Sequence, residues 1–238
     1  MWSGRTHRLA PTERYSAVKH SYYTPKGGLP AQSERLYAPA VFTSAYAVIP
    51  AAVMSDIVTS FLPLWAGARA WIIARPLSGF AETFAQLIVE LAPGGGSTEP
   101  EPDAMGEAVI FVVAGTLALT IGDENHTLTP GGYAFVAPGV SWSIINSGSA
   151  PATFHWIRKA YEKVHGIEAP TSFVTSDQAV KPTAMPDTNG AWATTRFVDP
   201  ADLRHDMHVH IVTFKPGGVI PFAETHVMEH GLYVLQGQ

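Results

Sequence analysis

The sequence contains one short pattern twice, and this internal repeat constrains the fold more than any other feature. Glu107–Gly115 (EAVIFVVAG) is matched by Glu229–Gly237 (EHGLYVLQG), and each run follows an apolar run that ends in a Pro-Gly-Gly turn, at Pro93 and at Pro216. The copies lie about 120 residues apart, and each has the order strand, turn, loop, strand, glycine. We therefore expect two related units in tandem.

Short β-rich runs separated by Gly and Pro fill much of the chain. The 238 residues include 21 Gly and 19 Pro, and turn signals such as IGDEN at Ile121 and PGG at Pro130 separate the runs. Short strands spaced in this way indicate an all-β sandwich or barrel. Long segments with a helical period are lacking, so helices should be few and brief. The expected strands are Ala85–Leu91, Val109–Val113, Thr116–Ile121, Tyr133–Val136, Thr153–Ile157, His208–Phe214 and Leu232–Leu235.

Composition excludes several classes of function. Hydrophobic residues make up 46% and charged residues 15%, which is typical of a globular protein. The net charge of −5 argues against nucleic-acid binding and against binding to anionic membranes. No cysteine is present, so disulfides, thiolate metal sites and a cysteine nucleophile are all excluded. This composition fits a cytoplasmic protein.

The most apolar stretch does not have the character of a membrane span. Val41–Trp65 carries one charge, Asp56, but Pro50 and Pro63 help divide it into pieces shorter than a bilayer crossing requires. Its Val, Thr and Tyr content suits buried strands instead. We expect no membrane partner.

A candidate metal site lies in the second copy. The stretch Gly218–Gly237 (GVIPFAETHVMEHGLYVLQG) places Glu224, His226 and His230 at even spacings. On extended backbone these three side chains face one side, with a bend possible in the VME interval. Two imidazoles and one carboxylate suit Mn²⁺, Fe²⁺, Ni²⁺ or Zn²⁺, so the ligands alone do not fix the metal. Glu229 has the opposite parity, and we expect it to be structural or solvent-facing.

The spacing of this stretch matches the first signature motif of the cupin superfamily, G-x5-H-x-H-x3-E-x6-G, at every position. Glu224 stands where that motif usually has its first His, and His230 stands where it usually has Glu. The permuted form resembles the (S)-ureidoglycine aminohydrolase family, whose members are two-cupin, manganese-dependent enzymes of purine-ureide breakdown. The resemblance implies two tandem cupin barrels.

The resemblance also implies roles for individual residues. Glu224, His226 and His230 would bind Mn²⁺, and Glu224 would in addition anchor the amine of a ureide substrate as a catalytic residue. A histidine that matches His210 lines the substrate pocket in the family, so we expect His210 to contact substrate. His208, on the same strand, is expected to be a hydrogen-bonded histidine near a barrel mouth. The implied reaction releases ammonia from ureidoglycine and gives ureidoglycolate.

The second copy stops soon after its motif. The chain ends at Gln238, and a metal-binding glutamine of the family would fall about 26 positions further on. We therefore expect the second barrel to be incomplete in this chain. The alternative function is a non-catalytic or inactive bicupin that binds a small molecule or a metal. A cupin oxygenase that uses Fe²⁺ is a third possibility.

The first copy lacks the metal-ligating residues. Pro102, Ala104 and Ala108 occupy the positions of the three ligands, and Trp142 or Ser143 occupies the position of the later one. We expect this barrel to be metal-free, to pack against the second barrel and to support a homo-oligomer. The acidic loop STEPEPDAMGE lacks an EF-hand pattern and is expected to be solvated.

Four segments follow from this division of the chain. They are residues 1–80 with N-terminal strands that pack between the barrels, 81–160 with the first cupin barrel, 161–205 with a connection and strands, and 206–238 with the start of the second, metal-binding barrel.

Overall fold

The computed structural model describes residues 40–43, 45–54, 60, 62–76, 83–222 and 228–237. Residues 40–42 and 47–54 form one small unit, and the other described residues form a second, larger one. The predicted boundaries of the four segments stay a prediction.

The small unit contains two very short strands and one helical turn. β1 (Val41–Phe42) pairs antiparallel with β2 (Ala47–Val48), and α2 (Ala51–Met54) follows. Val41 and Val48 are exposed, so the expectation of buried strands in this region is wrong at these positions. Two-residue strands cannot cover an apolar face by themselves. Among the described residues, no helix has the length and apolar character that a membrane crossing requires.

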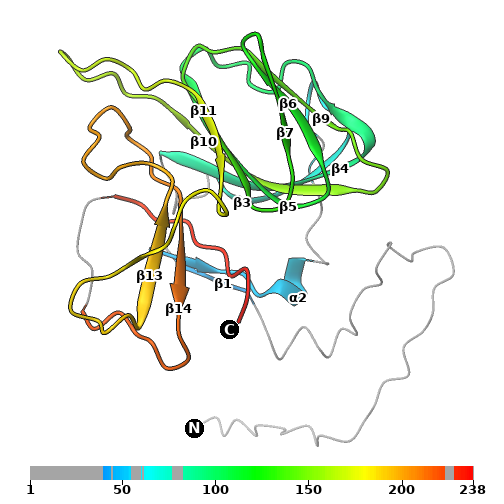
Figure 1. The fold of residues 1–238 in the computed structure, drawn as a ribbon. Helices are drawn as coiled ribbons and strands as arrows, with labels where there is room; N and C mark the ends of the chain where they lie inside the picture. The colour runs from blue at the N-terminus through cyan, green and yellow to red at the C-terminus, as the bar shows by residue number, and fades with distance from the viewer. Residues whose placement is uncertain are drawn as a thin grey trace, which may run out of the picture. The chain divides into compact units, whose positions relative to one another are not determined.

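The large unit is built on a nine-stranded antiparallel sheet that curls into a barrel (Figure 1). The strands follow the order β11-β8-β5-β10-β4-β9-β6-β7, and β3 pairs with the free side of β4. Their bounds are β3 (Ala66–Ala74), β4 (Phe84–Ser97), β5 (Gly106–Ala114), β6 (Leu117–Ile121), β7 (Glu124–Leu128), β8 (Gly132–Val136), β9 (Trp142–Asn146), β10 (Ala152–Ala160) and β11 (Phe173–Ser176). The all-β prediction is confirmed.

Turn chemistry explains where these strands end. β6 and β7 are joined by two residues, since Ile121 is opposite Glu124, and Gly122 has a φ of +56°. A glycine at this place allows the tight hairpin turns that match strand twist. The turn predicted at the IGDEN sequence is confirmed.

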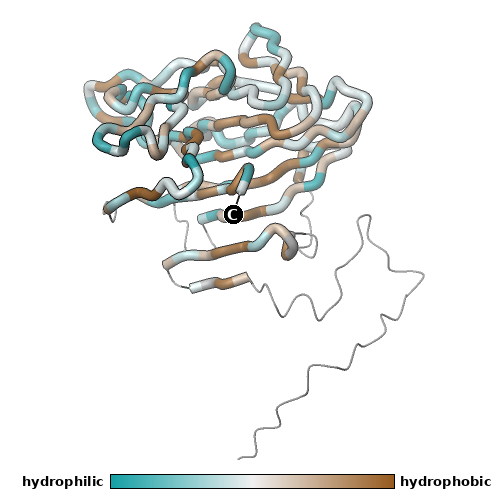
Figure 2. Tube along the Cα trace, turned by 60° about the horizontal axis from the view of Figure 1, so that its bottom comes forward, coloured by the Kyte–Doolittle hydropathy of each residue, from teal (hydrophilic) through white to brown (hydrophobic). Residues whose placement is uncertain are grey.

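The barrel interior is closed by large apolar side chains. Trp65 packs against Trp156 with ring centroids 5.3 Å apart, and Trp142 meets Trp156 edge-on at 6.0 Å. All three tryptophans are buried, together with Phe154 and the aliphatic residues of β4, β5, β6 and β9. Brown apolar segments recur along the strands of the barrel in Figure 2. Burial of this surface is the main source of the barrel's stability.

A second, three-stranded antiparallel sheet follows the barrel, in the order β12 (Thr183–Ala184), β13 (Trp192–Arg196) and β14 (His210–Phe214). The residues around it cover the outer face of β8. Tyr133 stacks on Phe197 with centroids 4.1 Å apart, and Met207 belongs to the same apolar cluster. Because β8 is covered on both faces, all five of its residues are buried.

The repeat in the sequence is also a repeat in backbone geometry. The first glycines of the two Pro-Gly-Gly turns, Gly94 and Gly217, have φ values of +72° and +78°. A side chain on the next glycine, Gly95 or Gly218, would lie 2.9 or 3.0 Å from the carbonyl oxygen three residues earlier. Both turns therefore require glycine for the same reasons, namely a left-handed φ and a close backbone contact. The turn that opens the metal motif has the geometry of its counterpart in the first copy.

The last glycines of the repeat agree as well, but the strands before them do not. Gly115 and Gly237 have φ values of +82° and +91°. The first copy enters Gly115 from β5, whereas residues 228–237 form no strand, so the predicted strand Leu232–Leu235 is wrong in this structure. Strand pairing needs a neighbouring backbone, and this segment contacts the barrel through side chains instead.

Candidate functional site

The predicted metal ligands lie only partly within the described residues. Glu224 and His226 fall outside them, while His230 belongs to the exposed segment 228–237. Within the described part of the chain, no group of three His, Asp or Glu side chains is arranged to hold a metal. The three-ligand arrangement therefore stays a prediction.

Glu229, next to the predicted ligand His230, is held by the first barrel. Its Oε2 atom accepts a hydrogen bond from the backbone N–H of Thr83 at 3.0 Å and another from the Thr83 hydroxyl at 2.6 Å. Thr83 directly precedes β4. The contact supports the structural role expected for Glu229.

Two further residues of this segment meet the barrel. The Tyr233 ring lies edge-on to the His155 ring with centroids 4.4 Å apart, and a Cβ atom on Gly231 would lie 2.2 Å from Oε1 of Gln86. His155 on β10 and Gln86 on β4 are polar but buried. Burial lowers the pKa of His155 to about 4, so its imidazole is neutral at physiological pH.

His208 and His210 are both exposed, as expected for residues that share a face. Val209 and Ile211 alternate with them and pack against the apolar cluster of Tyr133 and Phe135. His210 is opposite Arg196 in the β13–β14 ladder. Its contact with substrate stays a prediction.

The ligand positions of the first copy are occupied by small or apolar residues in the barrel wall and at its edge. Ala108 is buried on β5, and Trp142 is buried on β9 against Trp156. Pro102 and Ala104 are exposed before β5. The expectation of a metal-free first barrel stays a prediction, supported by the chemistry of these side chains.

The acidic loop before β5 is less solvated than expected. Glu101 forms an ion pair with Arg158 of β10, and its side chain is only 4% exposed. The expectation of a fully solvated loop is wrong at this residue because Arg158 reaches across from the neighbouring strand.

A buried carboxyl cluster, which the sequence did not reveal, links the barrel to the loop before β14. Glu107 on β5 is completely buried, and Asp206 forms an ion pair with Lys159 of β10. Burial, and then the neighbouring Asp206 carboxylate, raise the pKa of Glu107 to about 9. Glu107 is therefore protonated at neutral pH and can donate to Asp206. Burial opposes ionisation of Asp206, but hydrogen bonds from Glu107 and Lys159 lower its pKa.

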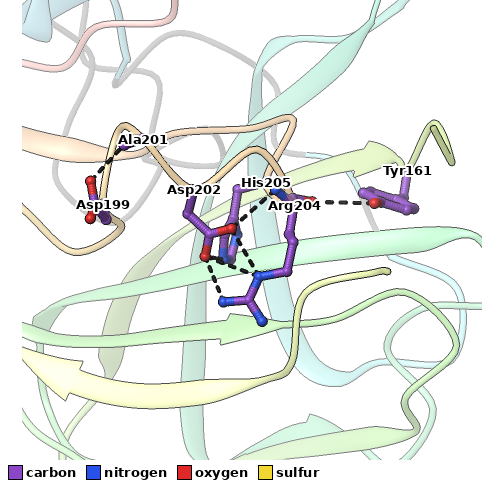
Figure 3. Close-up of polar contacts among 6 residues, drawn as sticks. All are labelled: Tyr161, Asp199, Ala201, Asp202, Arg204 and His205. Carbon is purple, nitrogen blue, oxygen red and sulfur yellow. Dashed lines mark hydrogen bonds and ion pairs between the residues drawn. The ribbon is translucent and has the colours of Figure 1, made fainter. Parts of the chain in front are cut away.

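A pocket of about 200 Å³ lies beside this loop. Phe173 and Phe197 line it together with Asp202, Arg204 and His205. Figure 3 shows the Arg204 guanidinium turned back onto the Asp202 carboxylate, with an Nη2–Oδ2 distance of 2.7 Å. This hydrogen-bonded pairing lowers the pKa of Asp202, and burial lowers the pKa of His205. Asp202 and Arg204 neutralise each other, and Asp199 adds a further carboxylate to the lining of the pocket.

Comparison with known proteins shows the family. Residues 87–158 match the Cupin domain family. The crystal structure of the putative glyoxylate induced protein from Pseudomonas aeruginosa is 60% identical in sequence, with a TM-score of 0.76 over 87% of this chain and 75% of that protein. The structure of the protein Ylba from E. coli has a TM-score of 0.69 over 83% of this chain and 76% of its own. The two sequences are 21% identical, so this likeness shows a shared fold.

Curated relatives are named for one reaction. The (S)-ureidoglycine aminohydrolase of Escherichia coli (strain K12) is 26% identical over 185 residues, which are 76% of this chain and 68% of that protein. The (S)-ureidoglycine aminohydrolase of Arabidopsis thaliana is 27% identical over 182 residues, and this chain spans 58% of its length, less than two thirds. From these similarities, the chain belongs to the same family of cupin proteins as the glyoxylate induced protein of Pseudomonas aeruginosa, and it is similar to curated (S)-ureidoglycine aminohydrolases.

Proposed function

We propose that this protein is an (S)-ureidoglycine aminohydrolase, an enzyme that releases ammonia from ureidoglycine in purine and allantoin breakdown. The observation that carries the proposal is the permuted motif, Glu224, His226 and His230 between Gly218 and Gly237, in a chain whose relatives are named for this reaction. In the balanced reaction, water replaces the amine: the C–N bond breaks, a C–O bond forms, and ureidoglycolate and ammonia leave.

The donor set fits manganese. A carboxylate and two neutral imidazoles, without thiolate, are ligands that Mn²⁺ accepts, and they do not exclude Fe²⁺, Ni²⁺ or Zn²⁺. Glu224, His226 and His230 would hold the ion. When bound, the metal would supply a template and electrostatic stabilisation for the polar groups of the substrate.

The protein's own residues would orient the small ureide substrate. The second oxygen of Glu224 would accept a charge-assisted hydrogen bond from the substrate amine. His210, exposed on β14, would offer a polar contact to the same substrate. The two ligating histidines must be neutral to bind metal, so we expect activity to fall as the pH drops below about 6.

The test measures ammonia release from freshly generated ureidoglycine, together with metal analysis of the purified protein. We expect Glu224→Gln and His226→Ala to abolish both metal retention and ammonia release, while His165→Ala, at an exposed position, changes neither. Full activity in either ligand variant would refute the assignment. Metal binding without ammonia release would favour the non-catalytic alternative, and oxygen consumption with bound iron would favour an oxygenase.

We further propose that the protein works in the cytoplasm as a homo-oligomer, without nucleic-acid or membrane partners. The net charge of −5 supports the absence of the last two. Light scattering of the purified protein tests the oligomeric state, and a monomer at micromolar concentration would contradict it.

A further inference from the structure

We propose that the pocket beside the loop before β14 is a binding site for a small organic molecule that carries a primary ammonium group. The residues that line this pocket include Phe173, Phe197, Asp199 and His205. It shares no residue with the predicted metal motif, so the inference goes beyond the proposed function and does not depend on it.

One part of the lining is aromatic. The rings of Phe173 and Phe197 both stack on Tyr133 of β8, with centroids 5.8 and 4.1 Å apart. Tyr133 is completely buried, so it holds the two phenyl rings in place before any ligand arrives. Phenyl rings offer no ligand to a metal ion, but their faces suit the carbon atoms of an organic molecule and attract a nearby cation.

The charged part of the lining has one carboxylate more than it has cations. Arg204 is engaged by Asp202, with Nε–Oδ1 and Nη2–Oδ2 distances of 2.9 and 2.7 Å (Figure 3). Such a pair satisfies both of its charged groups. Asp199 forms no ion pair within the described residues, and its Oδ1 atom accepts a hydrogen bond from the backbone N–H of Ala201 at 2.9 Å. The remaining negative charge of Asp199 therefore favours a cation in the pocket.

A buried imidazole adds an acceptor to the same lining. The side chain of His205 is only 6% exposed, and within the described part of the chain its Nδ1 atom has no hydrogen-bond partner. Burial lowers the pKa of His205, so the ring is neutral and one of its nitrogens is an acceptor. Nε2 lies 3.9 Å from Oδ2 of Asp202, and the negative charge there favours the proton on Nε2. Nδ1 is then a buried acceptor that a donor in the pocket would satisfy.

Hydrogen bonds hold the loop that carries these groups. The backbone N–H of Asp202 donates to the carbonyl of Asp199 at 2.9 Å, and that of His205 donates to the carbonyl of Asp202 at 3.3 Å. The hydroxyl of Tyr161, which follows β10, donates to the carbonyl of Arg204 at 3.2 Å. Since the loop is ordered before binding, a ligand does not have to supply the free energy that ordering would cost.

These features together define the ligand. An ammonium group has three N–H donors and a positive charge, which match the acceptors on Asp199 and His205. An anion would meet a guanidinium that Asp202 already occupies, and it would be repelled by Asp199. The volume of about 200 Å³ is below the range of about 300–1,000 Å³ that is usual for drug-sized ligands, so the molecule is small.

The test titrates the whole chain with benzylammonium and measures the dissociation constant by ligand-observed NMR. We expect a dissociation constant at or below about 1 mM, which is ordinary for a ligand of about eight non-hydrogen atoms. Benzyl alcohol and benzoate carry the same ring without the ammonium group. Each should bind at least about tenfold more weakly, because the charge-assisted hydrogen bonds are lost.

Two sets of variants assign the binding to the pocket. Asp199→Asn keeps an acceptor for the N–H of Ala201 but removes the charge, and it should weaken benzylammonium binding about tenfold. Asp123→Asn, at an exposed position between β6 and β7, makes the same change in net charge and should leave binding unchanged. His205→Leu should weaken binding about fivefold, whereas His205→Asn places an amide oxygen near the position of Nδ1 and should stay within about twofold of wild type. Thermal unfolding checks that each variant is folded.

Several outcomes would overturn the proposal. Benzoate or benzyl alcohol that binds as tightly as benzylammonium would show that the pocket does not select an ammonium group. Unchanged binding in Asp199→Asn would place the probe elsewhere, for example at the predicted metal motif. Equal losses in His205→Leu and His205→Asn would show that His205 does not act as an acceptor for the ligand.

Discussion

Replacing Glu107 with Gln should remove most of the pH dependence of stability between pH 7 and 8.5. Burial and the Asp206 carboxylate raise the pKa of Glu107 to about 9, whereas in the unfolded chain its pKa is near the ordinary value of 4.5. Between these two values the folded protein holds a proton that the unfolded chain has lost. The contribution of this group to stability is therefore full below the unfolded pKa and is lost as the pH rises through the folded pKa.

The expected magnitude follows from this difference. One proton bound only in the folded state changes the free energy of unfolding by about 1.4 kcal/mol per pH unit. From pH 7 to 8.5 the wild-type protein should lose about 2 kcal/mol through this group. The buried histidines His155 and His205 do not interfere, because burial lowers their pKa values and their effect lies below this window. In Glu107→Gln, which stays neutral at every pH, the same change should be close to zero.

Urea unfolding followed by tryptophan fluorescence measures this slope, since Trp65, Trp142 and Trp156 report on the barrel core. Glu99→Gln, at an exposed position, is the control and should keep the wild-type slope. An unchanged slope in Glu107→Gln would refute the protonated state of Glu107, whatever the variant's stability at a single pH.

Two further predictions concern the barrel and the pocket. Asn146→Leu should lower the free energy of unfolding by about 2–3 kcal/mol, because Asn146 is buried and donates to the carbonyls of Leu91 and Ala150 at 2.9 and 2.8 Å. Urea unfolding measures this loss, and a loss below about 0.5 kcal/mol would contradict the prediction. Arg204→Gln should raise the pKa of Asp202 toward its ordinary value near 4, because hydrogen bonds from Arg204 lower the Asp202 pKa in the wild-type protein. Carboxyl NMR titration measures the Asp202 pKa, and an unchanged value would show that Arg204 does not cause the shift.

The strands of the first barrel could be predicted because their sequence signals are local. The runs at Val109–Val113 and Tyr133–Val136 are continuous apolar stretches bounded by glycine turns, and both form strands in the barrel. β3 was missed because its sequence, AGARAWIIA, mixes Arg and Ala with apolar residues. The run Leu232–Leu235 has the same composition as a strand, but a strand also needs a partner, which composition does not reveal.

The candidate metal ligands could be predicted because they lie close together in the sequence at regular spacings. Glu224, His226 and His230 lie in one short motif, so their parity was visible. The pairing of Glu107 with Asp206, and that of Thr83 with Glu229, join residues far apart in the chain. Such contacts depend on how β4, β5 and the later segments pack, and no local pattern encodes them. The sequence contained one hint of these contacts. Glu107 and Glu229 match each other within the repeat, but the repeat does not show which residues they contact.

The indole-filled interior of the first barrel has a consequence for protein engineering. Ala108 occupies the place of His230, and Trp142 lies where a later ligand would belong. Inserting an imidazole at Ala108 alone would overpack a filled wall, while shortening Trp142 alone would leave a void. Converting this copy into a second metal centre therefore requires several substitutions at once, some to create space and others to introduce ligands.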